Sequence, residues 1–226
     1  MPLLVDRPSV LVAGATGLVG RQLLGQLLAD RHTGTVHALV RREVQDLPNS
    51  ERLLRHRLDL TKKLALPAAG VAYIALGTTI KAAGSQAAFA TNDRDAVIAI
   101  ARAAQKAGVT HLAAVSALGA DAASSIFYNR IKGEMEAGLA ALGFKRLVIF
   151  RPSLLAGHRD LIGQPLRLGE KLALTLLAPI AHLLPAKLRP IDAAVVARAM
   201  RRVLREDGPA VQFVESAEMQ TIGAAK

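Results

Sequence analysis

Tyr128 and Lys132 stand four residues apart in a helical stretch. Residues at this spacing share one face of a helix, so the two side chains are neighbours. An ammonium group stabilises a tyrosinate, which suits a tyrosine that gives or takes a proton at a carbonyl oxygen. Ser116 ends the strand predicted before this helix, and its hydroxyl can bond the same oxygen. We predict that Ser116, Tyr128 and Lys132 are catalytic; the alternative is a surface tyrosine beside a lysine.

A glycine-rich turn near the start of the chain is suited to hold a cofactor. The apolar run 10–13 is followed by Gly14, Gly17 and Gly20, and a helical pattern begins at residue 18. The spacing is related to the dinucleotide-binding fingerprint: Gly14 turns the chain, Gly17 lets a pyrophosphate approach, and Gly20 lets the helix pack on the strand. The N–H groups at the helix start face the anion. The alternative is an ordinary turn that carries glycines.

Two arginines follow the next predicted strand, 36–40. An NAD site has an acidic residue at this place, whereas Arg41 and Arg42 suit the 2′-phosphate of NADP. We therefore expect NADP(H) to be preferred over NAD(H), unless the arginines are only a solvated strand end.

Two further strand ends face the same predicted crevice. Asp59 follows the strand 53–57 and either lies beside an adenine pocket or caps a helix near Thr61. Gly77 and Thr78 follow the strand 71–76 and either line the cofactor or form a simple turn.

The rest of the chain alternates in the same way. Apolar periodicity predicts helices over 84–108 and 124–142, strands over 111–115, 146–151 and 211–214, and a late helix from about 191 with an outward, solvated arginine face. Residues 153–190 are irregular, which is typical of the substrate side of a cleft. We predict one domain over 1–226, with 153–190 as a cap-like insertion.

Composition narrows the function. Of the 226 residues, 51% are hydrophobic and 3% aromatic, which is typical of helices on a parallel sheet. Cysteine is absent, so disulfides and cysteine-based metal sites are excluded, and we predict no metal. The net charge of +11 is scattered in short clusters without a DNA-binding motif, so we expect no nucleic-acid binding.

The location follows from the apolar segments. The start of the chain lacks the charged and apolar regions of a signal peptide. The apolar stretch 172–184 is shorter than the roughly 20 residues of a spanning helix and contains Pro179 and His182. We therefore expect a cytoplasmic protein that does not bind membranes; the alternative is that 172–184 docks on a membrane or a lipid-like substrate.

Together these motifs resemble the atypical or extended short-chain dehydrogenases/reductases. Within them, the chain is similar to the HTATIP2/TIP30-like branch of NADP-binding proteins. The resemblance rests on the glycine turn, Leu39-Val40-Arg41-Arg42, Ala75-Leu76-Gly77-Thr78-Thr79, Asp93-Arg94-Asp95, Ser116-Ala-Leu-Gly119-Ala120-Asp121, Tyr128-Asn-Arg-Ile-Lys132-Gly133-Glu134 and Phe150-Arg151-Pro152.

The resemblance implies a doubly wound, mostly parallel Rossmann sheet with helices on both faces. It implies NADP(H) contacts from Gly14, Thr16, Gly17, Leu18, Val19, Gly20, Arg41, Arg42, Asp59, Leu60, Leu76, Gly77, Thr78, Tyr128 and Lys132. Arg41 and Arg42 would hold the 2′-phosphate, Asp59 and Leu60 would lie near adenine, and Lys132 would bind the nicotinamide ribose.

The resemblance also implies an NADP(H)-dependent oxidoreductase that acts on a small carbonyl or alcohol, with Ser116 and Tyr128 as the catalytic pair. Many relatives add an asparagine as a fourth member; here Asp93 stands at that place and Asn92 is one residue away. Because the branch includes regulators, the alternative is an NADP(H)-binding interaction module. A homodimer is compatible with either, and the substrate is left open.

Overall fold

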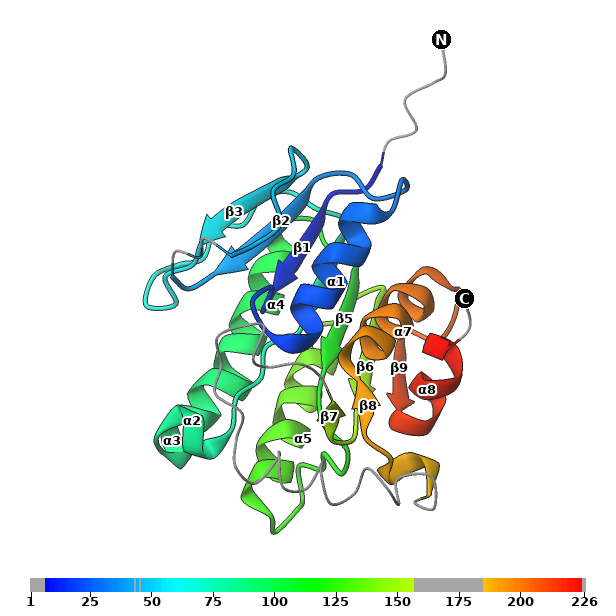
Figure 1. Cartoon of the computed structure of the whole chain (residues 1–226). Coiled ribbons are helices and arrows are strands. Elements are labelled where there is room, and N and C mark those ends of the chain that lie inside the picture. Colours follow the sequence, from blue (N-terminus) through cyan, green and yellow to red (C-terminus); the bar gives the residue numbers. More distant parts are fainter. Residues whose placement is uncertain (1–6, 43, 45, 157–184, 225–226) are drawn as a thin grey trace.

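Seven parallel strands form a sheet at the centre of the protein (Figure 1). The structure is a computed structural model that describes residues 7–42, 44, 46–156 and 185–224. The strand order is β3-β2-β1-β4-β5-β6-β9. The strands are β1 (Val10–Ala13), β2 (Val36–Val40), β3 (Leu53–Arg57), β4 (Val71–Ile74), β5 (His111–Val115), β6 (Arg146–Arg151) and β9 (Val211–Glu215).

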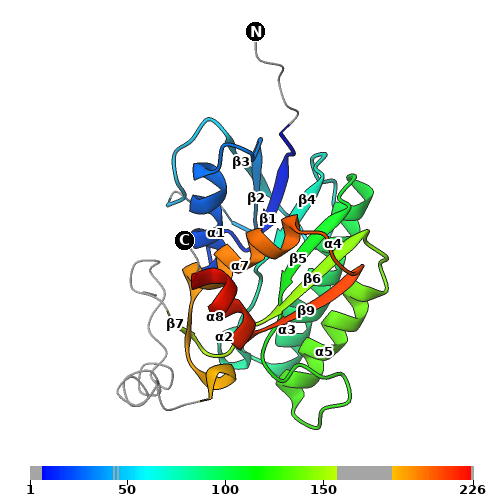
Figure 2. The same cartoon turned by 90° about the vertical axis from the view of Figure 1, so that its right-hand side faces the viewer.

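Helices cover both faces of the sheet (Figure 2). One face carries α1 (Leu18–Ala29), α7 (Ala193–Arg205) and α8 (Ser216–Ala224), and the other carries α4 (Ala96–Lys106) and α5 (Phe127–Ala140). Each face has its own apolar cluster. Because both faces are covered, every residue of β1 and β2 is buried. The expected doubly wound Rossmann fold is confirmed.

The alanine-rich stretch 84–108 is not one helix, contrary to our prediction. It contains α3 (Gln86–Ala90), the π-helix η1 (Thr91–Asp95) and α4, and the separate α2 (Ile80–Ala83) precedes it. The Ser85 hydroxyl accepts a hydrogen bond from the Ala88 N–H at 3.1 Å and starts α3 after Gly84, whose φ is +89°. The π-helix turns Asp93 into the interior, where its exposed fraction is 0%.

Several short elements were not predicted. A two-stranded parallel sheet pairs β7 (Leu155–Ala156) with β8 (Ile191–Asp192), and a 3₁₀ turn, η4 (Ala186–Leu188), precedes β8. The C-terminal helix α8 also lacks a sequence signal, because it is short and weakly amphipathic. β7 places residues 153–156 beside the end of β6, so part of the predicted insertion 153–190 is next to the sheet.

The arginines of α7 were expected to form a solvated face. This interpretation is incomplete, because several of them also bind neighbouring helices. Arg201 forms an ion pair with Asp30 at the end of α1, with 2.9 Å between Nη2 and Oδ2, and Arg205 binds the same carboxylate. Arg198 donates a hydrogen bond to the Gly223 carbonyl of α8 at 2.6 Å. These contacts join three helices that pack on one face of the sheet.

The predicted apolar stretch 172–184 lies outside the described residues. Within the described part of the chain, none of the helices combines the length and apolar character needed to cross a bilayer.

A histidine pair joins the two strands at one edge of the sheet. His37 Nδ1 lies 2.9 Å from His56 Nε2. Burial lowers the pKa of His37, and the neighbouring His56 lowers it further. The unfolded chain therefore binds a proton at His37 more readily than the folded chain does. The stabilisation of the folded chain is thus present above about pH 6.5 and is lost as pH falls.

We expect the urea midpoint to fall between pH 7.5 and pH 5.5, and to fall less in His37→Leu. The exposed His32 provides a matched control, and His32→Leu should keep the dependence of the unmodified protein. An unchanged dependence in His37→Leu would show that the pair does not cause the effect.

Candidate active site

The turn between β1 and α1 is built by two glycines that no other residue can replace without movement. Gly14 has φ +85°, and a Cβ on it would lie 2.5 Å from the Ala75 carbonyl oxygen. A Cβ on Gly20 would lie 2.7 Å from the Gly14 carbonyl carbon. A Cβ on Gly17 would have ordinary contacts, so the protein itself does not require glycine there. Glycine at this position is compatible with the predicted close approach of a pyrophosphate.

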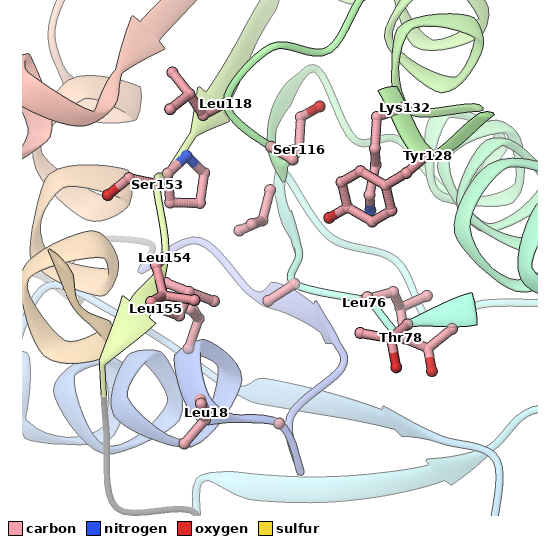
Figure 3. A pocket seen from close by; sticks show the side chains of 18 residues that line it. Leu18, Leu76, Thr78, Ser116, Leu118, Tyr128, Lys132, Ser153, Leu154 and Leu155 are labelled. Carbon is pink, nitrogen blue, oxygen red and sulfur yellow. The ribbon is translucent and has the colours of Figure 1, made fainter. Parts of the chain in front are cut away.

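A cavity of about 480 Å³ opens at this turn, at the carboxyl ends of the strands (Figure 3). Gly17, the N-cap of α1, has no side-chain cap, and the first turn contains no acidic residue. This helix start therefore suits an anion such as a pyrophosphate. The described residues that line the cavity are Gly17, Leu18, Val19, Ala75, Leu76, Gly77, Thr78, Thr79, Val115, Ser116, Ala117, Leu118, Tyr128, Lys132, Pro152, Ser153, Leu154 and Leu155.

Ser116 lies in this cavity just beyond the end of β5, and its side chain is 5% exposed. Its Oγ is buried and has no hydrogen-bond partner among the described residues. A buried hydroxyl without a partner costs free energy, so such groups call for an explanation. A ligand oxygen in the cavity would supply the missing partner.

Tyr128 and Lys132 enter the cavity from α5, and the Tyr128 hydroxyl points toward its middle (Figure 3). The Tyr128 ring packs on Phe89 of α3, with 5.3 Å between the ring centroids. Phe89 of α3 thus supports the Tyr128 ring, which projects from α5. The sequence-predicted trio of Ser116, Tyr128 and Lys132 lies together around one cavity.

Lys132 is held by a buried carboxylate. Its Nζ lies 2.7 Å from Asp93 Oδ1, and the two side chains are 3% and 1% exposed. The Thr78 backbone N–H donates to both oxygens of Asp93, at 3.2 and 3.0 Å. Asp93, not Asn92, therefore contacts Lys132 of the predicted trio.

A second, smaller cavity of about 60 Å³ adjoins the first and shares Leu76, Gly77 and Thr78 with it. Its other walls include Arg41, Leu60 and Asn92, and Arg41 Nη1 donates to Asn92 Oδ1 at 2.8 Å. The position at the end of β2 fits the adenosine half of a dinucleotide.

Some residues predicted to contact the cofactor line neither cavity: Gly14, Thr16, Gly20, Arg42 and Asp59. Asp59 instead accepts hydrogen bonds from the Thr61 N–H and hydroxyl, at 3.0 and 2.6 Å, and forms a surface turn. Gly14 and Gly20 instead allow the close backbone packing of the turn between β1 and α1. Residues 153–155, from the segment expected on the substrate side of the cleft, line the first cavity, whereas Leu118 and Pro152 were not singled out from the sequence as lining residues.

An arginine at the end of β6 holds α5, the helix that carries Tyr128 and Lys132 into the first cavity. Arg151 pairs with Glu136 of α5 through Nη2 and Oε2 at 2.5 Å, and with Glu215 of β9 at 3.2 Å. Hydrogen bonding to Glu136 raises the pKa of Arg151 above its usual value. This ion pair holds α5 against the sheet, one turn beyond Lys132.

Comparison with known proteins agrees with the fold and the turn. Residues 14–146 match the family described as NAD(P)H-binding. HTATIP2 from Rattus norvegicus is 36% identical over 175 residues, which cover 75% of this chain and 70% of the relative. Fmp52 from Aspergillus fumigatus is 35% identical over 202 residues, or 84% of each chain. The chain belongs to the NAD(P)H-binding family and, with these relatives, to the HTATIP2-like branch of atypical short-chain dehydrogenases/reductases.

Solved structures share the fold at low identity. Vestitone reductase from alfalfa has a TM-score of 0.66 at 16% identity, covering 92% of this chain and 76% of its own. UDP-glucuronic acid 4-epimerase from Bacillus cereus, in complex with NAD, has a TM-score of 0.67 at 17% identity, with 92% and 77% covered. The family match supports a nicotinamide cofactor and an oxidoreductase-type protein.

Our expectation of a cytoplasmic protein is wrong. The Fmp52 relatives from Emericella nidulans and Eremothecium gossypii, each 36% identical over 67% of this chain, are named as mitochondrial proteins. The expectation rested on the missing pattern of a secretory signal peptide, which has no bearing on a mitochondrial location.

Proposed function

We propose that the chain is an NADP(H)-dependent oxidoreductase that reduces a carbonyl compound or oxidises the corresponding alcohol. The observation that carries the proposal is the buried Ser116 hydroxyl, which has no hydrogen-bond partner in the described part of the chain and lies in the same cavity as Tyr128 and Lys132. This cavity begins at the uncapped start of α1, where a dinucleotide phosphate fits.

Each residue has a defined task in this reaction. When bound, NADPH supplies a hydride to the carbonyl carbon. The Ser116 hydroxyl donates a hydrogen bond to the carbonyl oxygen and orients it, and Tyr128 gives its proton to that oxygen. Lys132, held by Asp93, stabilises the tyrosinate that is left and binds the nicotinamide ribose. Leu118, Leu154 and Leu155 form an apolar part of the cavity wall.

The competing proposal is an NADP(H)-binding regulatory module without turnover. A panel of aldehydes, ketones and quinones is mixed with NADPH, and absorbance at 340 nm is followed with and without the protein. We expect consumption of NADPH with at least one class of carbonyl. Tight NADPH binding with no consumption across the panel would favour the regulatory module.

A substitution of Arg41 tests the proposed preference for NADP(H) over NAD(H). We expect Arg41→Ala to weaken NADPH binding by about 10- to 100-fold, because a charge-assisted contact to the 2′-phosphate is lost. NADH lacks this phosphate, so its affinity should change less. Titration calorimetry with both cofactors measures the two dissociation constants.

A matched control is Arg102→Ala, which removes an exposed arginine on α4 that lines neither cavity. It should leave both affinities unchanged. Equal losses of NADPH and NADH affinity in Arg41→Ala would contradict a 2′-phosphate contact.

A further inference from the structure

Asn92 and Asp93 are adjacent residues of the π-helix η1, and each binds a cationic side chain that lines a cavity. Asp93 binds Lys132 of the larger cavity at 2.7 Å. Asn92 Oδ1 accepts a hydrogen bond from Arg41 Nη1 at 2.8 Å, and both of these residues line the smaller cavity. π-Helices are rare and appear frequently at functional sites. The contact between Asn92 and Arg41 spans 51 positions of the chain and has no task in the proposed reaction itself.

The side-chain amide of Asn92 is held in one orientation. Its Nδ2 donates a hydrogen bond to the Ala88 carbonyl of α3 at 2.8 Å. A carbonyl only accepts and a guanidinium only donates, so the amide oxygen faces Arg41 and the amide nitrogen faces Ala88. The amide thus connects the residue after β2 to α3 and presents a fixed acceptor to the arginine.

The guanidinium of Arg41 keeps most of its donors for a ligand. Its N–H groups lie in one plane, and among the described residues Asn92 is the partner of this side chain, through Nη1 alone. The bond at Nη1 restricts the motion of the guanidinium. Nη2 and Nε remain for two parallel hydrogen bonds, which is the geometry in which arginine binds a phosphate.

Asn92 is neutral, so it holds Arg41 without offsetting its charge. The acidic side chains described near the smaller cavity have cations of their own. Asp93 is paired with Lys132, and Asp59, which stands between two lining residues, is paired with a lysine of its own surface turn at 3.5 Å. The charge of Arg41 is therefore available to an anion that enters this cavity.

We propose that Asn92 is a positioning residue for Arg41, and that it prepares the guanidinium to bind the 2′-phosphate of NADP(H). The inference rests on the proposed function and deepens it, because it assigns the choice between NADP(H) and NAD(H) to this pair of residues. A side chain that is already held loses less conformational freedom when it binds a ligand. NAD(H) lacks the phosphate, so the hold on Arg41 does not increase its affinity.

Asn92→Ala removes the acceptor and leaves Arg41 in place. Alanine is the better helix former, so η1 should keep its fold. We expect NADPH affinity to fall by about 3- to 10-fold, the usual effect of ordering one long side chain, and NADH affinity to stay within about twofold. Titration calorimetry measures both. Asn49→Ala is the matched control, since Asn49 is exposed and lines neither cavity, and it should leave both affinities unchanged.

Asn92→Asp tests the importance of a neutral side chain. An aspartate can still accept from Arg41, but it offsets the charge of the guanidinium and repels the phosphate. We expect NADPH affinity to fall by about tenfold or more, and NADH affinity to change by less than about threefold. Unchanged NADPH affinity in this variant would show that no phosphate binds beside Asn92, and the proposal would fail.

A double-mutant cycle tests whether Asn92 acts through Arg41. In the Arg41→Ala background there is no guanidinium left to position, so Asn92→Ala should change NADPH affinity by less than about twofold. In the Arg42→Ala background, which removes the neighbouring arginine, the effect of Asn92→Ala should persist. An effect of full size in Arg41→Ala would show that Asn92 contacts the cofactor itself, and would overturn the proposal.

Glu43 requires its own control, because it stands two positions beyond Arg41 in the sequence and lies outside the described residues. The effect of Asn92→Ala on NADPH affinity should persist in the Glu43→Gln background. Loss of the effect there would show that the hold on Arg41 depends on Glu43 rather than on Asn92 alone, which contradicts the proposal.

These affinities do not depend on turnover. If the coupling between Asn92 and Arg41 is found but no carbonyl is reduced, the role of Asn92 stands and the proposed oxidoreductase activity fails. If carbonyls are reduced with NADPH but Asn92→Ala binds NADPH as the unmodified protein does, the role of Asn92 fails alone.

Discussion

Tyr128→Phe is expected to reduce kcat by about 10²- to 10⁴-fold, which is the usual contribution of a positioned proton donor. The phenyl ring keeps the packing on Phe89, where the centroids are 5.3 Å apart, so the fold and the cavity are retained. NADPH affinity should change by less than about threefold, since most predicted cofactor contacts come from other residues. Steady-state kinetics with a carbonyl found in the screen, together with calorimetry, measures both quantities.

Tyr73→Phe is the matched control, since Tyr73 is the other tyrosine of the chain. It lies in β4 and is 2% exposed. Removing its hydroxyl should leave kcat within a few-fold of the unmodified protein. Full activity of Tyr128→Phe on the same carbonyl would rule out the proposed proton transfer, whatever the control shows.

Gly20→Ala is expected to lower the free energy of unfolding by about 1–3 kcal/mol, the usual cost of forcing extra volume into a packed site. The new Cβ would meet backbone atoms, 2.7 Å from the Gly14 carbonyl carbon and 3.0 Å from the Ala15 Cα. Backbone cannot yield as a side chain can, so α1 must shift away from β1. Because the start of α1 lines the cavity, we expect NADPH affinity to fall by at least about tenfold.

Gly25→Ala makes the same substitution in the same helix, where a Cβ would meet nothing within 4 Å. It should stabilise the protein by about 0.5–1 kcal/mol, because alanine is the better helix former. Urea unfolding gives the two free energies with opposite expected signs. If Gly20→Ala behaved like Gly25→Ala, close packing of α1 on the turn would not be the reason for Gly20.

Local signals were sufficient for most of the fold. The apolar runs predict β1 and β2 with the bounds that the structure gives, and Gly108 and Gly143 follow α4 and α5 closely. The break in the alanine-rich stretch was missed because alanine satisfies any helical register, so its periodicity cannot distinguish an α-helix from a π-turn. The mistaken reading of the α7 arginines arose for a related reason: charge alone does not reveal a partner such as Asp30, far away in the sequence.

The candidate site, like the fold, could be predicted from the sequence only in part. Ser116, Tyr128 and Lys132 stand out from their types and spacing, and the structure brings them to one cavity. Arg41 reaches the smaller cavity and Arg42 does not, although the two residues are adjacent in sequence. Successive residues at a strand end point in opposite directions, and only the folded chain shows which of them faces the crevice.

By itself, the sequence determined the fold class, the glycine-rich turn between β1 and α1 and the three residues proposed for chemistry, because each depends on contacts or spacing within one strand–helix unit. Only the tertiary structure decided that Asp93 faces Lys132, that the Ser116 hydroxyl is buried without a described partner, and that 152–155 form a wall of the cavity. The physical reason is that burial and charge pairing depend on the packing of η1, β5, α5 and β6, and these elements approach one another only when the sheet is assembled.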